Sequence, residues 1–147
     1  IRLGYDSVNL NGLKEALMKQ NKVHHFWNKF SEVLFKGNLN LPIFDYRKLF
    51  VDFHSNVILG ENDFPTIISG WDNSPRSGTK GRILINYNPD SFAEHVKKVL
   101  NKCELKDDEH NLIFLKSWNE WAEGNYVEPD MKYGWQYLDV LRKAIVK

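Results

Sequence analysis

The sequence predicts an α/β fold with a parallel sheet, and three observations support that prediction. Two short runs, Pro65–Gly70 and Leu112–Ser117, are apolar without alternation, which is typical of parallel strands covered on both faces. A segment with helical periodicity follows each run, at Ser91–Lys102 and Tyr133–Val146. Both runs also end in a tryptophan followed by polar residues, as at the functional ends of parallel strands. The pattern alone fits a fragment of a (β/α)₈ barrel and a small doubly wound domain equally well.

The first part of the chain predicts helices. Residues Asn9 to Lys36 place apolar side chains at the i, i+3, i+4, i+7 spacing, and Gly37 ends the segment. Asp45 is positioned to cap a second, short helix. The apolar face of that helix comprises Tyr46, Leu49, Phe50 and Phe53. We therefore expect a helical, variable segment over residues 1–44 and a βαβα part over residues 45–147.

The elements of the second half follow from the same rules. Ser74–Gly78 is a turn by composition, and Ile83–Ile85 predicts a short extended piece. Asp90 is expected to cap the helix that begins at Ser91. The acidic stretch Asp107–Glu109 favours a solvated loop over a metal site. The stripe of the Ser91 helix comprises Phe92, Val96, Val99, Leu100 and Cys103, and the last helix is expected to turn Leu138, Leu141 and Ile145 inward.

Composition excludes several classes of function. The 147 residues suit one domain or part of a larger one, and 20 basic against 19 acidic residues give no electrostatic case for nucleic acid. No apolar run is long enough to span a membrane. Cys103 is the single cysteine, so we expect neither an internal disulfide nor a metal site or other cofactor built on it. The chain starts at Ile1 rather than Met, which favours a partial sequence.

The stretch from Trp118 to Gly124 carries the strongest chemical signal. It places Glu120 and Glu123 three residues apart, beside Trp121, where a strand runs out. An unpaired polar group inside an apolar layer costs roughly 1–3 kcal/mol, so these residues suit a strand end. In an extended strand the two carboxylates face opposite ways. A turn at Trp121–Ala122 brings their Cα atoms within about 7 Å, and carboxyl groups about 5 Å apart are typical of retaining glycosidases. The alternative is a strand-to-loop junction with solvated glutamates.

The other polar cluster follows the first strand. Asp72, Asn73 and Arg76 are candidates for binding sugar hydroxyls or an anion, and Arg76 suits the diphosphate of a nucleotide sugar or polyprenyl carrier, with Lys80 and Arg82 nearby. The alternative is an Asx-turn in which Asp72 pairs with Arg76 and makes the loop rigid.

The tryptophans divide between stacking and packing. Trp71 and Trp121 are candidate platforms for sugar rings, whereas Trp118 continues the strand and is expected in the core. His24 and His25 lie on a predicted helix without further metal ligands, so surface or packing roles are favoured.

Two linked motifs resemble a known family. They are Gly70-Trp71-Asp72-Asn73-Ser74-Pro75-Arg76, after Phe64-Pro65, and Trp118-Asn119-Glu120-Trp121-Ala122-Glu123-Gly124-Asn125-Tyr126-Val127-Glu128-Pro129-Asp130, before Tyr133-Gly134-Trp135-Gln136-Tyr137-Leu138. Together they resemble the C-terminal part of the WbsX-like glycosyltransferases over about the last ninety residues. Those proteins are similar to the endo-α-mannosidases of glycoside hydrolase family ninety-nine, which are (β/α)₈ barrels.

The resemblance implies a fold and roles for the candidate residues. It implies that this chain is the C-terminal portion of a TIM-type barrel, a partial barrel preceded by a helical segment. It also implies that Glu120 deprotonates the sugar's own 2-hydroxyl and that Glu123 is the general acid/base, with retention through an anhydrosugar. The mannosidases usually continue Gly-Thr-Gln-Ile-Glu-Pro, whereas this chain keeps Glu128 but has Asn125 and Tyr126 before it. Glu128 either binds a sugar hydroxyl or braces the loop.

The expected function follows from the resemblance. We expect a WbsX-like protein that acts on glycosidic bonds in bacterial surface-polysaccharide biosynthesis, in the cytoplasm. Its substrates are an oligosaccharide or polysaccharide and, for transfer, a nucleotide-sugar donor. The alternatives are a retaining endo-α-mannosidase-like hydrolase and a non-catalytic carbohydrate-binding fragment. The catalytic candidates are Glu120 and Glu123, and the isolated chain is expected to be inactive. The substrate-binding candidates are Trp71, Asp72, Asn73, Arg76, Asn119, Trp121, Tyr126 and Glu128.

Overall fold

The computed structural model describes residues 6–14, 16–19, 42–53, 59–78, 81–104 and 106–146. Residues 13–14 and 16–19 are helical. The named elements, in chain order, are β1 (Val8–Leu10), β2 (Ile43–Asp45), α2 (Tyr46–Asp52), β3 (Asp63–Ile68), α3 (Ser74–Ser77), β4 (Ile83–Ile85), α4 (Pro89–Cys103), β5 (Phe114–Lys116), β6 (Asn119–Glu120), a 3₁₀-helix (Trp121–Glu123), β7 (Asn125–Tyr126) and α5 (Gln136–Ile145).

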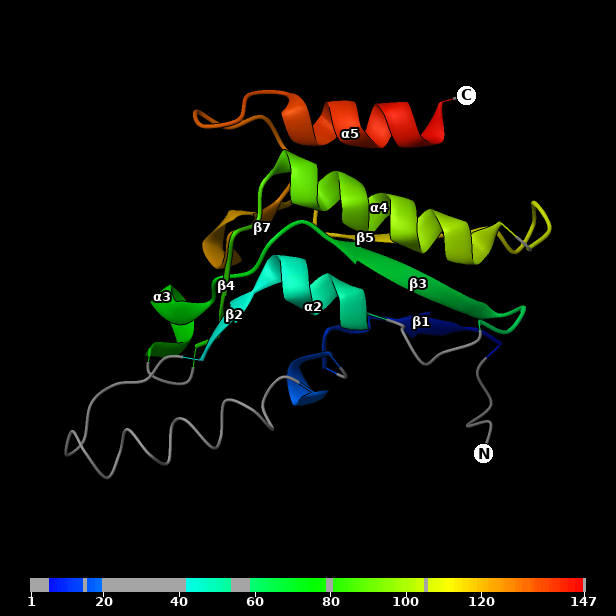
Figure 1. Ribbon diagram of the computed structural model, residues 1–147, viewed down its shortest axis with the longest axis horizontal. Helices are drawn as coiled ribbons and strands as arrows, with labels where there is room; N and C mark the ends of the chain where they lie inside the picture. The colour runs from blue at the N-terminus through cyan, green and yellow to red at the C-terminus, as the bar shows by residue number, and fades with distance from the viewer. Residues whose placement is uncertain are drawn as a thin grey trace.

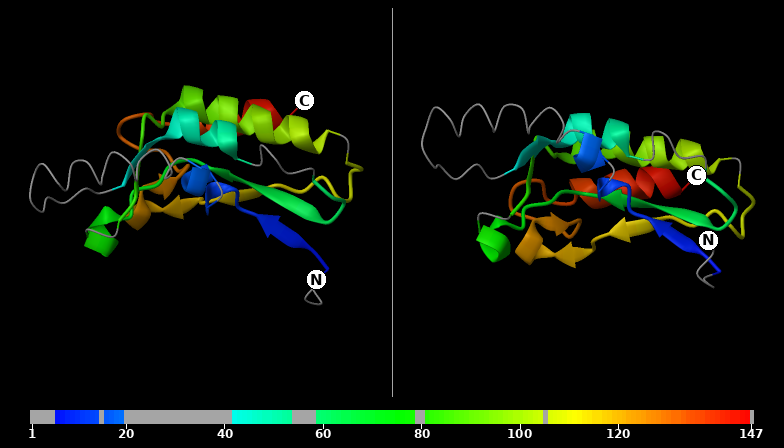
Figure 2. Two further views of the ribbon diagram at one scale, coloured as in Figure 1. Left: turned by 60° about the horizontal axis from the view of Figure 1, so that its bottom comes forward. Right: turned by 90° about the horizontal axis from the view of Figure 1, so that it is seen from below.

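Three parallel strands form the sheet that positions the site, in the order β1–β3–β5. Parallel neighbours need a crossover connection, and α4 supplies it between β3 and β5, packing on β3 and against α5. Helices α2, α4 and α5 lie along one face of this sheet (Figures 1 and 2). The expected α/β class with parallel strands is confirmed. The described residues form no closed barrel, so the partial barrel stays a prediction.

Strand β1 occupies the beginning of the segment expected to be helical. Asn9 pairs with Phe64 and Leu10 with Pro65, so the helix expected from Asn9 is wrong at its first residues. The physical reason is non-local, because main-chain pairing with β3 outweighs a helical apolar pattern at the segment's end. The helical residues 13–14 and 16–19 agree with the prediction, and residues 20–41, with His24 and His25, lie outside the described ranges. The division at residue 45 stays a prediction.

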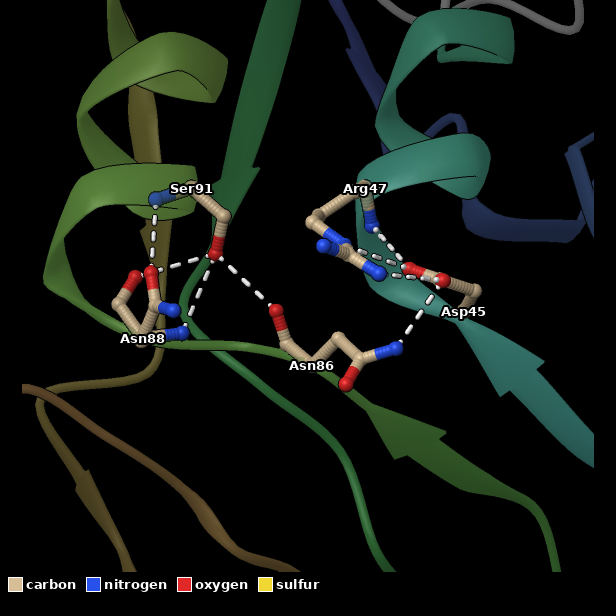
Figure 3. Close-up of polar contacts among 5 residues, drawn as sticks. All are labelled: Asp45, Arg47, Asn86, Asn88 and Ser91. Carbon is tan, nitrogen blue, oxygen red and sulfur yellow. Dashed lines mark hydrogen bonds and ion pairs between the residues drawn. The ribbon is translucent and has the colours of Figure 1, made fainter.

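Strands β2 and β4 form a second parallel pair, and helices α2 and α4 follow them in the chain. Asp45 caps α2 as expected, since its carboxylate accepts the Arg47 backbone N–H at 3.0 Å. The Arg47 guanidinium also binds this carboxylate, and the Asn86 amide donates to it at 2.9 Å (Figure 3). Chiefly through the Arg47 hydrogen bond, the pKa of Asp45 is lowered from 3.8 to about 2. Asn86 also accepts a hydrogen bond from the Ser91 hydroxyl through its backbone carbonyl, so it links the first turns of α2 and α4.

The N-cap of helix α4 (Pro89–Cys103) lies two residues before the predicted cap, Asp90. Asn88, not Asp90, is the N-cap: its side chain accepts the Ser91 N–H, and the Ser91 hydroxyl accepts the Asn88 N–H in return (Figure 3). Pro89 explains the difference, because its fixed φ favours the first helical position and leaves Asp90 inside the first turn.

The core forms two clusters, and β3 contributes Ile68 to one and Ile67 to the other. One surrounds α2 and includes Leu17, Phe44 and Leu84, and the other joins α4 to α5. In the first cluster the buried Tyr46 hydroxyl donates to the Ile68 carbonyl at 2.6 Å and lies 2.8 Å from His95 Nδ1. Tyr46 therefore fixes the carboxyl end of β3, from which the polar loop leaves. Cys103 is buried, in agreement with the packing role expected of it.

Three further expectations need correction. Strand β5 is an edge strand of the described sheet, so Phe114 is 47% exposed and the expected burial on both faces is wrong. Ile145 is also exposed, because it is the last residue of α5 and lies beyond the core contacts of Leu138 and Leu141. The expected turn from Ser74 to Gly78 is one turn of helix, α3.

Candidate functional site

The chain turns sharply after β5, as predicted. Strands β6 and β7 pair antiparallel, and the 3₁₀-helix between them contains Trp121, Ala122 and Glu123. Gly124 ends it in the left-handed region with φ of 58°, which glycine adopts at little cost. The turn removes the strand geometry that would send Glu120 and Glu123 to opposite faces.

Arg76 shows that the two carboxylates converge. Its guanidinium lies 3.3 Å from Glu123 Oε1 and 3.8 Å from Glu120 Oε1, so one cation contacts both side chains. Arg76 belongs to α3, in the loop after β3, while the glutamates follow β5. These strands are neighbours, and the two polar clusters that follow them therefore meet. The Asp72 N–H, which donates to the Glu123 carbonyl at 2.7 Å, joins the loops directly.

Asp72 and Asn73 shape the loop that holds Arg76. One Asp72 carboxylate oxygen accepts the Ser74 N–H at 2.9 Å and the Ser74 hydroxyl at 2.6 Å, which is the predicted Asx-turn. The expected pairing of Asp72 with Arg76 is wrong, because Arg76 binds the glutamates instead. Asn73 Oδ1 accepts the Arg82 N–H at 2.7 Å. Lys80 lies outside the described ranges.

An aromatic platform, Trp121 and Tyr126, lies beside the carboxylates. The two rings stack with centroids 3.7 Å apart and an interplanar angle of 15°. The Trp121 indole N–H donates to Glu128 Oε2 at 2.7 Å, and the Tyr126 hydroxyl donates to Asp130 at 3.0 Å. Burial, followed by this Asp130 contact, raises the pKa of Tyr126 to about 12. Glu128 thus braces the loop, and the half-exposed Trp121 presents a fixed apolar surface.

The other tryptophans differ from expectation. Trp118 is 53% exposed, so its expected place in the core is wrong. It follows an edge strand, and its backbone is used instead, with its carbonyl accepting the N–H groups of Val127 and Glu128. Trp71 is half-buried, and the Lys116 ammonium lies 4.4 Å from the centroid of its ring. Asn119 is exposed at the start of β6.

Asn125 is a positioning residue that the sequence reasoning missed. Its side chain is fully buried, and its Oδ1 accepts the Ser117 N–H at 2.6 Å and the Ser69 hydroxyl at 3.3 Å. Ser69 follows β3 and Ser117 follows β5, so a single amide ties the glutamate turn to both strand ends. Its only signal in the sequence is a polar residue directly after the glycine of the turn.

Gly70 and Tyr87 were also missed. A Cβ atom at Gly70 would lie 2.9 Å from the Tyr87 ring and 3.0 Å from the Gly124 carbonyl oxygen, so only glycine allows this approach. Burial and then the Asp72 charge raise the pKa of Tyr87, which lies beside the turn as a neutral phenol. The signal available was glycine after a buried strand.

In the described ranges, one group of potential ligands, Glu61, Asp107 and His110, has donor atoms within 4.8 Å of one another. It lies at the amino end of the sheet, away from the glutamates, and Asp107 is an exposed turn residue that binds His110. None of the described helices combines the length and apolar character needed to cross a membrane.

Comparison with known proteins identifies the family to which the sequence is similar. Residues 5–141 match the family described as Glycosyltransferase WbsX. Two relatives, each described as uncharacterized protein WxcX, come from strain B100 and a second strain of Xanthomonas campestris pv. campestris. They are 33% and 32% identical over 106 residues, which is 71% of this chain. The chain spans 15% of the length of each relative. No solved structure matches.

Proposed function

Because the chain belongs to the WbsX glycosyltransferase family, we propose that Glu120 and Glu123 are the catalytic carboxylates of a protein that acts on glycosidic bonds. The observation that carries this proposal is their shared contact with Arg76, which brings two acid–base groups to one side of a turn. Most glycosidases use a pair of carboxyl groups that flank the glycosidic bond.

The proposed chemistry proceeds in two balanced steps. Glu120 takes the proton of the sugar's 2-hydroxyl as that oxygen attacks the anomeric carbon, while the bond to the leaving oxygen breaks and Glu123 supplies a proton to it. An acceptor hydroxyl then opens the anhydrosugar at the anomeric carbon. Its proton passes to Glu123, and Glu120 returns a proton to the 2-oxygen.

Neighbouring side chains supply binding and orientation. Trp121, held by Tyr126 and Glu128, is proposed to stack on a sugar ring. Asn119 is proposed to contribute hydrogen bonds to hydroxyls, and Trp71, Asp72 and Asn73 to do so from the adjacent loop. Arg76 is proposed to hold the two carboxylates in position before substrate binds.

The biological setting is part of the same proposal. Membership of a glycosyltransferase family supports transfer of sugar to a growing oligosaccharide or polysaccharide from a nucleotide-sugar donor. We place this reaction in the synthesis of bacterial surface polysaccharide, in the cytoplasm. A retaining endo-α-mannosidase-like hydrolase is the second candidate, favoured by the carboxylate pair itself, since water then replaces the acceptor hydroxyl.

Product analysis distinguishes these reactions. The full-length protein is incubated with nucleotide sugars and acceptor glycans and, separately, with mannose-containing oligosaccharides, and the products are identified by mass spectrometry. Lengthened acceptors with released nucleotide support transfer. Shortened oligosaccharides without nucleotide dependence support hydrolysis. Glycan binding without any product in either incubation contradicts the catalytic proposal and favours a carbohydrate-binding role.

A further inference from the structure

A cavity lies at the carboxyl ends of β1 and β3, where parallel sheets commonly bind ligands. Its volume of about 460 Å³ falls within the range of small-molecule sites. One wall comes from the chain that follows β1, and its lining residues are Asn11, Leu13, Lys14, Leu17 and Met18. The other comes from Trp71, in the loop after β3, from Arg82, directly before β4, and from Leu84 in β4.

Two cationic residues, Lys14 and Arg82, line this cavity. Lys14 belongs to the segment after β1 and Arg82 directly precedes β4, and among the residues that the structure describes no acidic side chain lines the cavity. Within the described ranges neither cation forms an ion pair, whereas Arg76 contacts both glutamates and Arg47 contacts Asp45. Two uncompensated positive charges on one cavity favour an anionic ligand with more than one charge.

The rest of the lining favours an apolar or aromatic group on that anion. Leucine and methionine side chains and the edge of Trp71 supply this surface; the residues are Leu13, Leu17, Met18, Trp71 and Leu84. A planar base suits such a wall. The long tail of a polyprenyl carrier exceeds a cavity of this size, so the lining favours a nucleoside diphosphate over a lipid diphosphate.

Hydrogen bonds connect the cavity wall to the glutamate turn. The Leu84 N–H donates to the Trp71 carbonyl at 2.7 Å, and Asn73 exchanges hydrogen bonds with the backbone of Arg82. Asp72, next in the chain, donates its N–H to the Glu123 carbonyl. The cavity and the proposed catalytic carboxylates are therefore built on the same loop.

We propose that this cavity binds the nucleoside diphosphate part of the sugar donor, an inference that rests on the proposed function. In transfer, the 2-oxygen attacks the anomeric carbon as Glu120 takes its proton. The bond from that carbon to the diphosphate oxygen breaks, its electron pair leaves on the diphosphate, and Glu123 supplies a proton to that oxygen. Lys14 and Arg82 compensate the negative charge that gathers there. The acceptor oxygen then bonds to the anomeric carbon and opens the anhydrosugar. Its proton goes to Glu123, which the first step left deprotonated, and Glu120 returns a proton to the 2-oxygen.

The test measures binding rather than turnover. Uridine, guanosine and thymidine diphosphates are titrated into the full-length protein by calorimetry, beside the corresponding nucleosides, inorganic pyrophosphate and a short polyprenyl diphosphate. At least one nucleoside diphosphate is expected to bind more tightly than its nucleoside and than pyrophosphate. Lys14→Met and Arg82→Met should each weaken that binding roughly 10- to 100-fold, the effect of losing one charge-assisted hydrogen bond. Lys97→Met, an exposed change on α4 outside the cavity, is the matched control.

Each outcome decides the proposal. Weaker binding in both cavity variants, with unchanged binding in the control and unchanged thermal unfolding, supports it. Binding that both cavity variants retain, preference for the lipid diphosphate, or no binding of any diphosphate overturns it. Glu120→Gln and Glu123→Gln separate the two proposals, because they should bind the nucleoside diphosphate like the wild type. If these variants lose turnover while no diphosphate enters the cavity, the proposed function stands and this inference fails.

Discussion

Replacing Asn125 with leucine tests how the glutamate turn is held to the sheet. Leucine has a similar volume but no acceptor, so the Ser117 N–H and the Ser69 hydroxyl lose the oxygen that they share. An unsatisfied buried N–H costs about 1–3 kcal/mol, and the longer hydroxyl bond contributes about 1 kcal/mol. Removing the Asn125 Nδ2, which is buried without a partner among the described residues, returns about 1 kcal/mol. We expect a net loss of about 2 kcal/mol.

Urea denaturation of the full-length protein measures this loss, with Ser69→Ala as the matched control. That control removes only the 3.3 Å bond and should cost about 1 kcal/mol or less. Turnover of Asn125→Leu should fall further than its folded fraction explains, since the turn carrying Glu120 and Glu123 is no longer fixed. The reasoning is refuted if Asn125→Leu unfolds at the wild-type urea concentration, or if Ser69→Ala is equally costly.

Three other predictions concern residues that stabilise the fold around the candidate site. The pKa of Asp45 is lowered from 3.8 to about 2, so its ion pair with the exposed Arg47 stabilises the fold above about pH 4 and is lost as the pH falls toward 2. Asp45→Asn should therefore lower the unfolding free energy by about 1 kcal/mol near neutral pH, and the difference from the wild type should shrink as the pH falls toward 2. A variant that is as stable as the wild type at neutral pH contradicts this. Gly70→Ala should cost about 1–3 kcal/mol and reduce turnover, because its Cβ meets the Tyr87 ring and a carbonyl; wild-type thermal unfolding would rule out that close approach. Lys106→Met removes an ammonium that donates to three backbone carbonyls, so the unfolding free energy measured in urea should fall by about 2 kcal/mol; an unchanged urea midpoint would show that these contacts contribute little.

The sequence predicted those elements whose signal is local. The continuous apolar run of β3 and the period of α4 needed only neighbouring residues, as did the carboxylate that caps α2. Strand β1 is different, because Asn9 and Leu10 are extended through pairing with β3, and nothing nearby in the chain encodes that pairing. The cap of α4 was misplaced for a local reason, since Pro89 begins the helix before Asp90.

The same distinction between local and non-local signals applies to the candidate site. The turn between Glu120 and Glu123 was predictable from Gly124 and from the need to bring both carboxylates to one face. The ion pairs of Arg76 could not be predicted in this way. Arg76 lies close to Asp72 in the sequence, but it binds two glutamates that follow a different strand, β5. Asn125 was missed for a similar reason, as its two donors come from separate strand ends.

The central claim is that Glu120 and Glu123 carry out chemistry on a glycosidic bond, and conservative substitution tests it most directly. Glu120→Gln and Glu123→Gln keep the shape of the side chain and remove its acid–base capacity. Turnover of the full-length protein on the substrate found by mass spectrometry is measured for both variants, with the exposed Glu94→Gln on α4 as the control. We predict that turnover falls by about 10²- to 10⁴-fold in each variant, while glycan binding and the control stay at the wild-type level. Full turnover in both glutamine variants would contradict the account.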